Sequence, residues 1–174
     1  MLFARYNGVD ISASNKSECK AAIEKGQQVM LHVQHAVYTW EGSLNKFMVD
    51  EKGMSALCVF GLPPMAHADD AKRATAAAKM MVETVEELGL NASVSIGITT
   101  GLVYCGVIGS EERREVRWCC WLEHCSLTWI LCLQYTVIGH YVNLAARLMC
   151  SSGDNEVCCN QQRDSRHLSL AHVG

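Results

Sequence analysis

The chain has 174 residues, of which 49% are hydrophobic and 19% charged, a composition typical of one globular domain and not of a disordered chain. Its formal net charge of −3, without any block of lysine and arginine, gives no reason to expect a nucleic-acid partner. The first residues lack the features of a signal peptide and no apolar run reaches the ~18–20 residues that cross a bilayer, so we expect a cytoplasmic protein with no transmembrane segment.

The first elements in chain order are a weak strand near the N-terminus, a helix and a pair of strands. The helix is expected over residues 16–41, where apolar residues recur near helical spacing and Asn15 can cap the first turn. Two apolar runs follow, residues 44–49 and 55–62, and a short charged turn containing glycine separates them. This arrangement predicts a β-hairpin.

A second helix is expected over residues 67–89, with acidic side chains in its first turn, where the helix dipole favours them. The β-branched runs 92–101 and 102–109 then meet at a Thr-Gly turn, which predicts a second hairpin. The resulting β-α-β-β-α-β order is typical of an α+β, ferredoxin-like sandwich. In such a sandwich both helices cover one face of an antiparallel sheet.

Three blocks of the chain resemble the class III nucleotide cyclase catalytic domain, and they occur in the order of that family. The blocks are NKFMVDEKGMSALCVFGLP, SVSIGITTGLVYCGVIGS and YTVIGHYVNLAARLM, and they are most similar to the second cyclase domain of soluble, bicarbonate-responsive adenylyl cyclases. The resemblance implies a cyclase-like sandwich over residues 1–149, truncated at its C-terminus. It also implies that active sites lie between two such domains, one half supplying two metal-binding aspartates and the other positioning the nucleotide.

Asn143 and Arg147 stand four residues apart in the third block, so they project from the same face of the expected helix. The spacing alone is also that of an exposed polar stripe. The resemblance implies that Asn143 holds the ribose and that Arg147 stabilises the charge that develops on the α-phosphate in the transition state. Val142, Ala146 and Met149 are expected to face the core.

Lys46 and Thr136 occupy the positions at which the family reads the base. Adenine presents an acceptor at N1 and a donor at its amino group, so a lysine donor and a threonine acceptor suit it. Guanine would instead call for a carboxylate at the lysine position. The pair therefore favours adenine, although a lysine in a strand is also typical of a solvated edge.

The metal-binding residues of the family are where this chain departs. The first hairpin turn of a metal-binding half carries Gly-Asp, whereas this chain has Gly53-Met54, and a thioether does not bind hard Mg²⁺. Asp10 is a weak metal-ligand candidate, in a four-residue stretch that loosely resembles the other metal motif. We therefore expect Mg²⁺ or Mn²⁺ to be held by a partner domain and none by this chain alone.

Residues 116–134 interrupt the family pattern, because removing them joins GVIGSEERRE directly to YTVIGHYVN, which is the pattern of the family. This segment contains three of the four tryptophans and four of the ten cysteines, and we interpret it as an insertion from alternative splicing or a translated intron. Two alternatives are membrane association and a zinc site. The zinc ligands would come from Cys119, Cys120, His124, Cys125 and Cys132, but two adjacent cysteines fit one tetrahedron poorly.

Residues 150–174 show no hydrophobic period, so we expect a tail that is disordered or foreign to the family. The adjacent Cys158 and Cys159 invite a redox or metal interpretation, which a flexible tail would not support. Because there is no signal peptide, the cysteines are expected to be reduced thiols.

The residues and the resemblance together indicate an adenylyl-cyclase-like domain, the non-metal half of a two-domain unit that converts ATP to cyclic AMP and pyrophosphate in intracellular signalling. Its partners would be ATP and a second cyclase domain. The alternative is a catalytically silent dimerisation or regulatory module, or a truncated splice product, since the metal-binding aspartate is missing.

Overall fold

The computed structural model describes residues 1–9, 15–50, 53–107 and 135–160. Its strands are β1 (Leu2–Asn7), β2 (Ser43–Asp50), β3 (Gly53–Val59), β4 (Ser93–Ile98), β5 (Tyr104–Val107), β6 (Tyr135–Ile138) and β7 (Glu156–Cys159). Its helices are α1 (Lys16–Thr39), α2 (Asp70–Thr84), the short 3₁₀ helix η1 (Val85–Leu88) and α3 (His140–Ser151). The expected α+β class is confirmed.

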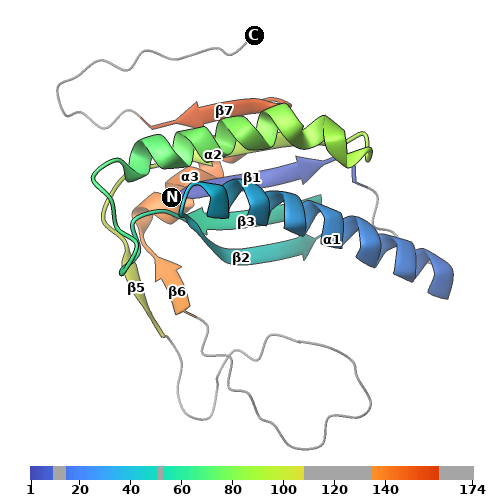
Figure 1. Ribbon diagram of the computed structural model, residues 1–174, viewed down its shortest axis with the longest axis horizontal. Coiled ribbons are helices and arrows are strands. Elements are labelled where there is room, and N and C mark those ends of the chain that lie inside the picture. The colour runs from blue at the N-terminus through green and yellow to red at the C-terminus, as the bar shows by residue number, and fades with distance from the viewer. Residues whose placement is uncertain (10–14, 51–52, 108–134, 161–174) are drawn as a thin grey trace, which may run out of the picture.

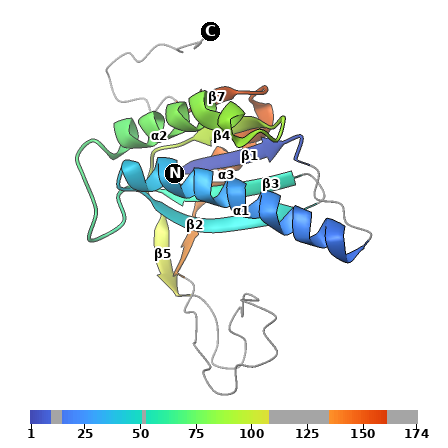
Figure 2. The ribbon, with the colours of Figure 1, turned by 45° about the vertical axis from the view of Figure 1, so that its right-hand side comes forward.

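Five strands form the main sheet in the order β2-β3-β1-β4-β7, and β5 pairs with β6 in a separate two-stranded sheet (Figure 1). Helices α1 and α2 cover one face of the main sheet, and α3 lies behind the opposite face (Figure 2). The larger hydrophobic core lies between α1, α2 and the sheet. A smaller apolar cluster, built from Met1, Leu57, Val59, Val137 and Ala145, packs on the α3 face.

Strand β1 is the centre of the sheet, although its sequence predicts only a weak strand. It pairs antiparallel with β3 on one side and with β4 on the other. Leu2, Ala4 and Tyr6 are fully buried, whereas the residues between them are half-buried. Alternate residues of a strand point to opposite faces, so β1 directs its buried residues under α1 and α2 and the others toward α3.

Local signals predicted the first helix and the first hairpin correctly. Asn15 caps α1, because its side-chain oxygen accepts a hydrogen bond from the backbone N–H of Glu18 at 3.0 Å. The β2–β3 hairpin forms at the expected place. The second helix is shorter than expected, since α2 ends at Thr84 and the chain tightens into η1 before Gly89 turns it with a left-handed φ of 63°.

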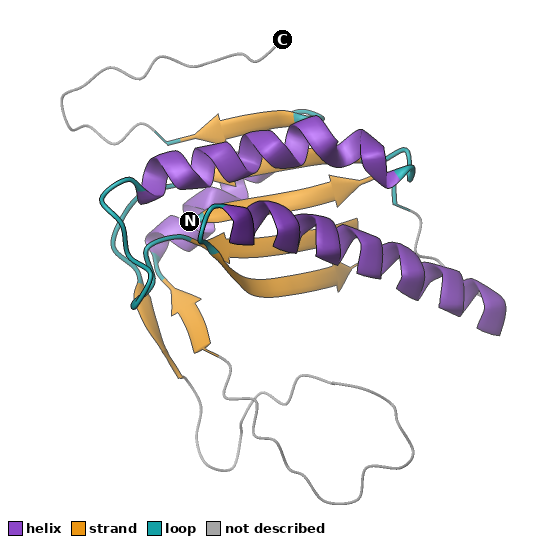
Figure 3. Ribbon diagram, viewed as in Figure 1, coloured by secondary structure: helices purple, strands orange, loops and turns teal. Residues whose placement is uncertain are grey.

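The predicted second hairpin is wrong. Strand β4 is buried along almost its whole length and uses both its edges, one for β1 and the other for β7. No edge remains for β5, which pairs antiparallel with β6 instead. Figure 3 shows the β5–β6 pair projecting away from the main sheet.

The expectation for residues 150–174 is wrong over the part that the structure describes. Helix α3 continues to Ser151, and β7 adds to the edge of the sheet. Because β7 runs parallel to β4, the sheet is mixed and not purely antiparallel. Residues 161–174 lie outside the described residues. Within the described ranges, none of the helices combines the length and the apolar character needed to cross a membrane.

Gly97 allows α3 to approach the sheet closely. A Cβ atom at this position would collide with the backbone of Ala145 and Met149. The helix therefore lies with its backbone directly over β4, which would be impossible with any larger residue. The side chains of Ala145 and Met149 are buried in this contact, and Ala146, which the sequence predicts in the core, is only half-buried.

Candidate functional site

The candidate site lies on the face of the sheet that α3 covers only in part. Lys46 of β2 stands opposite Leu57 of β3, which in turn stands opposite Phe3 of β1 and, through it, Gly97 of β4. Residues paired across antiparallel strands project to the same face. Leu57 belongs to the apolar cluster beneath α3. Lys46 is therefore half-buried on the α3 face and not on the face that α1 and α2 cover.

Helix α3 presents an exposed polar stripe at its surface. Asn143, Arg147 and Cys150 are all exposed, and they follow one another at intervals of four and three residues. Val142, Ala145 and Met149 lie on the other side and pack against the sheet. The amphipathic pattern fixes the rotation of the helix, so the predicted pairing of Asn143 with Arg147 on one exposed face is confirmed.

Strand β6 leads directly into α3 and lies beside the edge strand β2 of the main sheet. The backbone of Thr136 pairs with that of Gly106 in β5, and β6 lies within contact distance of β2, the strand of Lys46. The next residue, Val137, is buried in the same apolar cluster as Leu57. Gly101 also serves this junction, because a Cβ atom there would collide with the ring of Tyr141. The fold thus brings the strand of Thr136, the α3 stripe and Lys46 to one side of the sheet.

The metal-binding position does not fit a divalent cation. Met54 is 1% exposed and lies under α1, where its methyl group approaches Gly26. It stands opposite Tyr6 in β1 and belongs to the main core. A buried thioether offers no oxygen to Mg²⁺. Across the described ranges, no three His, Cys, Asp or Glu side chains lie close enough to hold a metal ion.

Several candidates of the sequence analysis lie outside the described residues. These are Asp10 and the whole segment 116–134, with its cysteines and histidine. Cys158 and Cys159 are described, and both belong to β7. Cys159 is exposed at the surface, but partial desolvation still raises the pKa of its thiol, with a further contribution from Cys158, and a raised pKa does not favour a reactive thiolate.

One cation on this face was missed by the sequence analysis. Arg5 lies in β1, two residues after Phe3, and therefore points to the α3 face. Its Nη2 atom donates a hydrogen bond to the Sγ atom of Cys150 at 3.5 Å, which places its guanidinium beside the α3 stripe. The only signal was a charged residue in the apolar run LFARYN, and such residues are common in edge strands.

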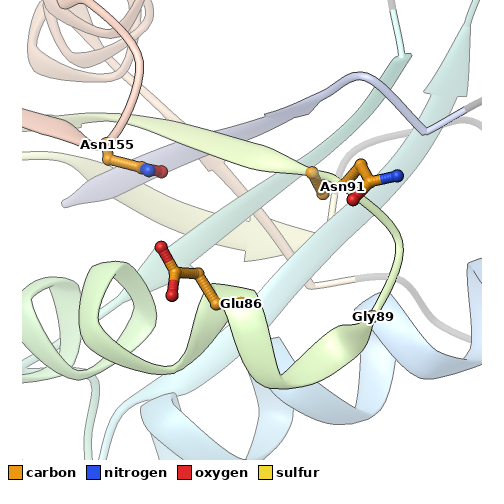
Figure 4. A pocket seen from close by; sticks show the side chains of 5 residues that line it. Glu86, Gly89, Asn91 and Asn155 are labelled. Carbon is orange, nitrogen blue, oxygen red and sulfur yellow. The ribbon is translucent and has the colours of Figure 1, made fainter.

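An open pocket of about 360 Å³ lies elsewhere, between the end of η1 and the turn before β7 (Figure 4). Its lining consists of Glu86, Gly89, Asn91, Ala92 and Asn155. The side-chain oxygen of Asn155 accepts a hydrogen bond from the backbone N–H of Val94 at 3.0 Å, so this amide has a structural task. None of the candidate nucleotide-binding residues lines this pocket.

Solved structures identify the fold. The guanylyl cyclase Cya2 superposes with a TM-score of 0.66 at 23% identity, over 90% of this chain and 71% of that one. The non-canonical dimeric guanylyl cyclase domain of the RhoGC fusion protein from Blastocladiella emersonii gives a TM-score of 0.65 at 18% identity, over 90% of this chain and 75% of the other. The chain therefore has the fold of a class III nucleotide cyclase catalytic domain.

Sequence comparison narrows the relationship. The chain is 32% identical to human adenylate cyclase type 10 over 123 residues, which are 71% of this chain, and it is homologous to the adenylyl and guanylyl cyclases. It spans only 6% of the length of that curated relative. No protein-family model matches the chain.

Proposed function

We propose that the chain is the nucleotide-positioning half of an adenylyl cyclase, which converts ATP to cyclic AMP and pyrophosphate together with a second cyclase domain. The observation that carries the proposal is the shared face of Lys46, Asn143 and Arg147. Three donors from two distant parts of the chain stand on one side of the sheet. The homology to adenylate cyclase type 10 supports the choice of reaction.

Each of the four candidate residues has a proposed role. Lys46 donates to N1 of adenine from the half-buried centre of β2, and Thr136 accepts from the amino group. Asn143 holds the ribose. Arg147, one helical turn further, stabilises the charge that develops on the α-phosphate, because an exposed guanidinium on a fixed helix is preorganised for that purpose.

The partner domain supplies the divalent metals and closes the site. The buried thioether of Met54 supports this division, since it stands where the resemblance places a carboxylate in a metal-binding half. The dimeric guanylyl cyclase domain among the solved structures supports a second domain as the partner. The chain by itself is then inactive.

The alternative is a catalytically silent module that keeps the fold in order to dimerise or regulate. The same buried Met54 favours it, because loss of a metal-binding position is typical of a degenerate catalytic domain. The two functions differ in one respect. Only the first requires Lys46 and Arg147 to act on a nucleotide when a metal-binding domain is present.

The test is a reconstitution assay. The chain is mixed with a metal-binding cyclase half, and cyclic AMP is measured with ATP and Mg²⁺. The proposal predicts activity that neither component has alone and that falls about 100-fold or more in Arg147→Ala, the size of effect expected when one transition-state donor is removed.

Controls separate chemistry from folding. Lys79→Ala changes an exposed cation on α2, which lies on the opposite face, and should leave the activity unchanged. Lys46→Glu should reduce the preference for ATP over GTP, since a carboxylate accepts from guanine. A mixture that stays inactive while the two domains associate would support the silent module instead.

A further inference from the structure

Arg5 occupies the middle of the sheet on the candidate face. It stands opposite Ser55 of β3 on one side and Ser95 of β4 on the other, and its side chain is half-buried. Phe3, two residues earlier on the same face, packs against the apolar cluster beneath α3. A guanidinium in such a position loses part of its hydration, so its placement must be offset by an interaction with an acceptor.

Among the described residues, the Arg5 guanidinium contacts only a weak hydrogen-bond acceptor, the thiol of Cys150. Its Nη2 atom donates to the thiol of Cys150 at 3.5 Å, and no other hydrogen bond of Arg5 occurs within the described ranges. A thiol is a poor acceptor, and a guanidinium carries five N–H donors. Cys150 is exposed and follows Arg147 by one helical turn, so the Arg5 guanidinium lies alongside the stripe that carries Arg147.

In the part of the chain that the structure describes, no carboxylate pairs with a cation of this face. Among the described residues, none of Arg5, Lys46 and Arg147 has a carboxylate oxygen within 4.0 Å. On the other side of the molecule, Arg73 pairs with both Asp69 and Glu41. The cations of the candidate face therefore differ from this paired arginine.

Two acidic residues of the neighbouring β7 region, Glu156 and Asp154, are engaged in other hydrogen bonds. Glu156 stands opposite Ser95, one strand beyond Arg5, but its Oε2 atom accepts from the backbone N–H of Gly153 at 2.7 Å. Asp154 accepts from Ser93 at 2.7 Å and from Asn7 at 3.2 Å. Both carboxylates thus serve the turn before β7, and neither pairs with Arg5.

We propose that Arg5 and Arg147 together form a binding site for the phosphate groups of a nucleotide. Arg5 contacts Cys150, which lies three residues after Arg147 on the exposed stripe of α3, and each guanidinium can bind an oxyanion through two parallel N–H donors. Arg5 thereby supplies positive charge from this chain itself. The identity of the anion as a nucleotide rests on the proposed function, whereas binding of a polyphosphate does not.

The test is a titration of the full chain in EDTA, with inorganic pyrophosphate, ATP and adenosine as probes. We expect pyrophosphate and ATP to bind, and Arg5→Met to weaken both about tenfold or more while adenosine binding stays unchanged. Arg5→Lys should keep part of the affinity, because it retains the charge but not the paired donors. Lys79→Met, which removes an exposed cation of the other face, is the matched control and should bind like the wild type.

A second measurement needs no substitution. Bound pyrophosphate should slow alkylation of Cys150 several-fold, as read by peptide mass spectrometry, because the anion would lie against that thiol. The exposed Cys19 of α1 is the internal control and should react at an unchanged rate. Equal rates at Cys150 with and without saturating pyrophosphate would overturn the proposal, as would a folded Arg5→Met chain with wild-type affinity.

The outcomes also separate this inference from the proposed function. Pyrophosphate protection of Cys150 without any cyclic AMP in the reconstituted mixture would retain the phosphate site and reject the cyclase. Cyclic AMP formation with no loss of affinity or activity in Arg5→Met would retain the cyclase and reject the phosphate site. A chain that binds adenosine but not pyrophosphate would overturn the phosphate site of Arg5 and Arg147 while leaving base recognition in place.

Discussion

The hydroxyl of Tyr6 lies 2.8 Å from Nδ1 of His32, and the other ring nitrogen of His32 lies 2.8 Å from the hydroxyl of Thr84. The Thr84 hydroxyl donates its proton to the carbonyl of Met80 at 2.7 Å, so it can only accept from His32. Nε2 therefore carries the ring proton, and Nδ1 accepts from Tyr6. This chain of bonds connects β1, α1 and α2 through a neutral imidazole.

We predict that this arrangement lowers stability in mild acid. Burial lowers the pKa of His32 below its ordinary value of 6.5, and the nearby Glu87 only partly opposes this. A lowered folded-state pKa means that the unfolded chain binds the proton more readily, so this contribution is complete above about pH 6.5 and is lost as the pH falls below that value. Urea denaturation at pH 7.5 and pH 5.5 measures the loss.

The pH dependence should be assigned by substitution. His32→Gln is expected to flatten the difference between the two pH values, because no group remains there to protonate. His35→Gln changes an exposed histidine of the same helix and should leave most of the stability difference between the two pH values. An unchanged difference in His32→Gln would show that other groups cause the effect.

Gly97→Ala should destabilise the protein by at least about 2 kcal/mol, because its Cβ atom would meet the backbone of Ala145 and Met149, which cannot rotate away. Gly26→Ala is the matched control. A Cβ atom at Gly26 would lie 3.7 Å from the methyl group of Met54, an ordinary contact, and the substitution should stabilise α1 by about 0.5–1 kcal/mol. Thermal and urea unfolding of both variants decide the matter.

Met54→Asp should not create a metal site. The new carboxyl group would be buried under α1 beside Tyr6, and we expect a loss of about 4 kcal/mol with no binding of Mn²⁺. Met54→Leu keeps the apolar volume and should cost less than about 1.5 kcal/mol. Stoichiometric Mn²⁺ binding by a stable Met54→Asp chain would contradict this account of the position.

Deletion of residues 116–134 should leave the fold intact. The chain leaves β5 at Val107 and enters β6 at Tyr135, and these two residues are paired with each other. The deletion shortens the connection to about a third of its length and should lower the entropy cost of closing it by about 1 kcal/mol. A variant that loses the Gly106–Thr136 pairing, as seen by backbone NMR contacts, would show that the segment is needed.

The sequence predicted those parts of the fold that depend on local chemistry. The cap at Asn15, the β2–β3 turn and the exposed pairing of Asn143 with Arg147 all follow from spacing over a few residues. The partner of β4 could not be predicted in this way. Its neighbours come from opposite ends of the described chain, and the adjacent strand β5 is excluded only because those neighbours fill both edges.

Arg5 was missed and the tail was predicted wrongly for the same reason, because their places depend on strands that are distant in the sequence. A single charged residue in a short apolar run is typical of an edge strand, whereas Arg5 lies in β1, the central strand of the sheet. The tail also lacked a hydrophobic period, since β7 has only four residues and exposes two of them. Its order comes from the edge of β4 and from the side chain of Asn155, neither of which leaves a local pattern.

The central position of β1 has a consequence for biosynthesis. Strand β1 is made before β3 and β4 and needs both as neighbours, and the hydrogen bond that closes this arrangement joins the backbone nitrogen of Met1 to the carbonyl of Thr99, 98 positions away. Contacts of such long range are slow to form. A nascent chain that stops before β4 leaves one edge of β1 open, so we expect shortened translation products to be targets of chaperones and proteases.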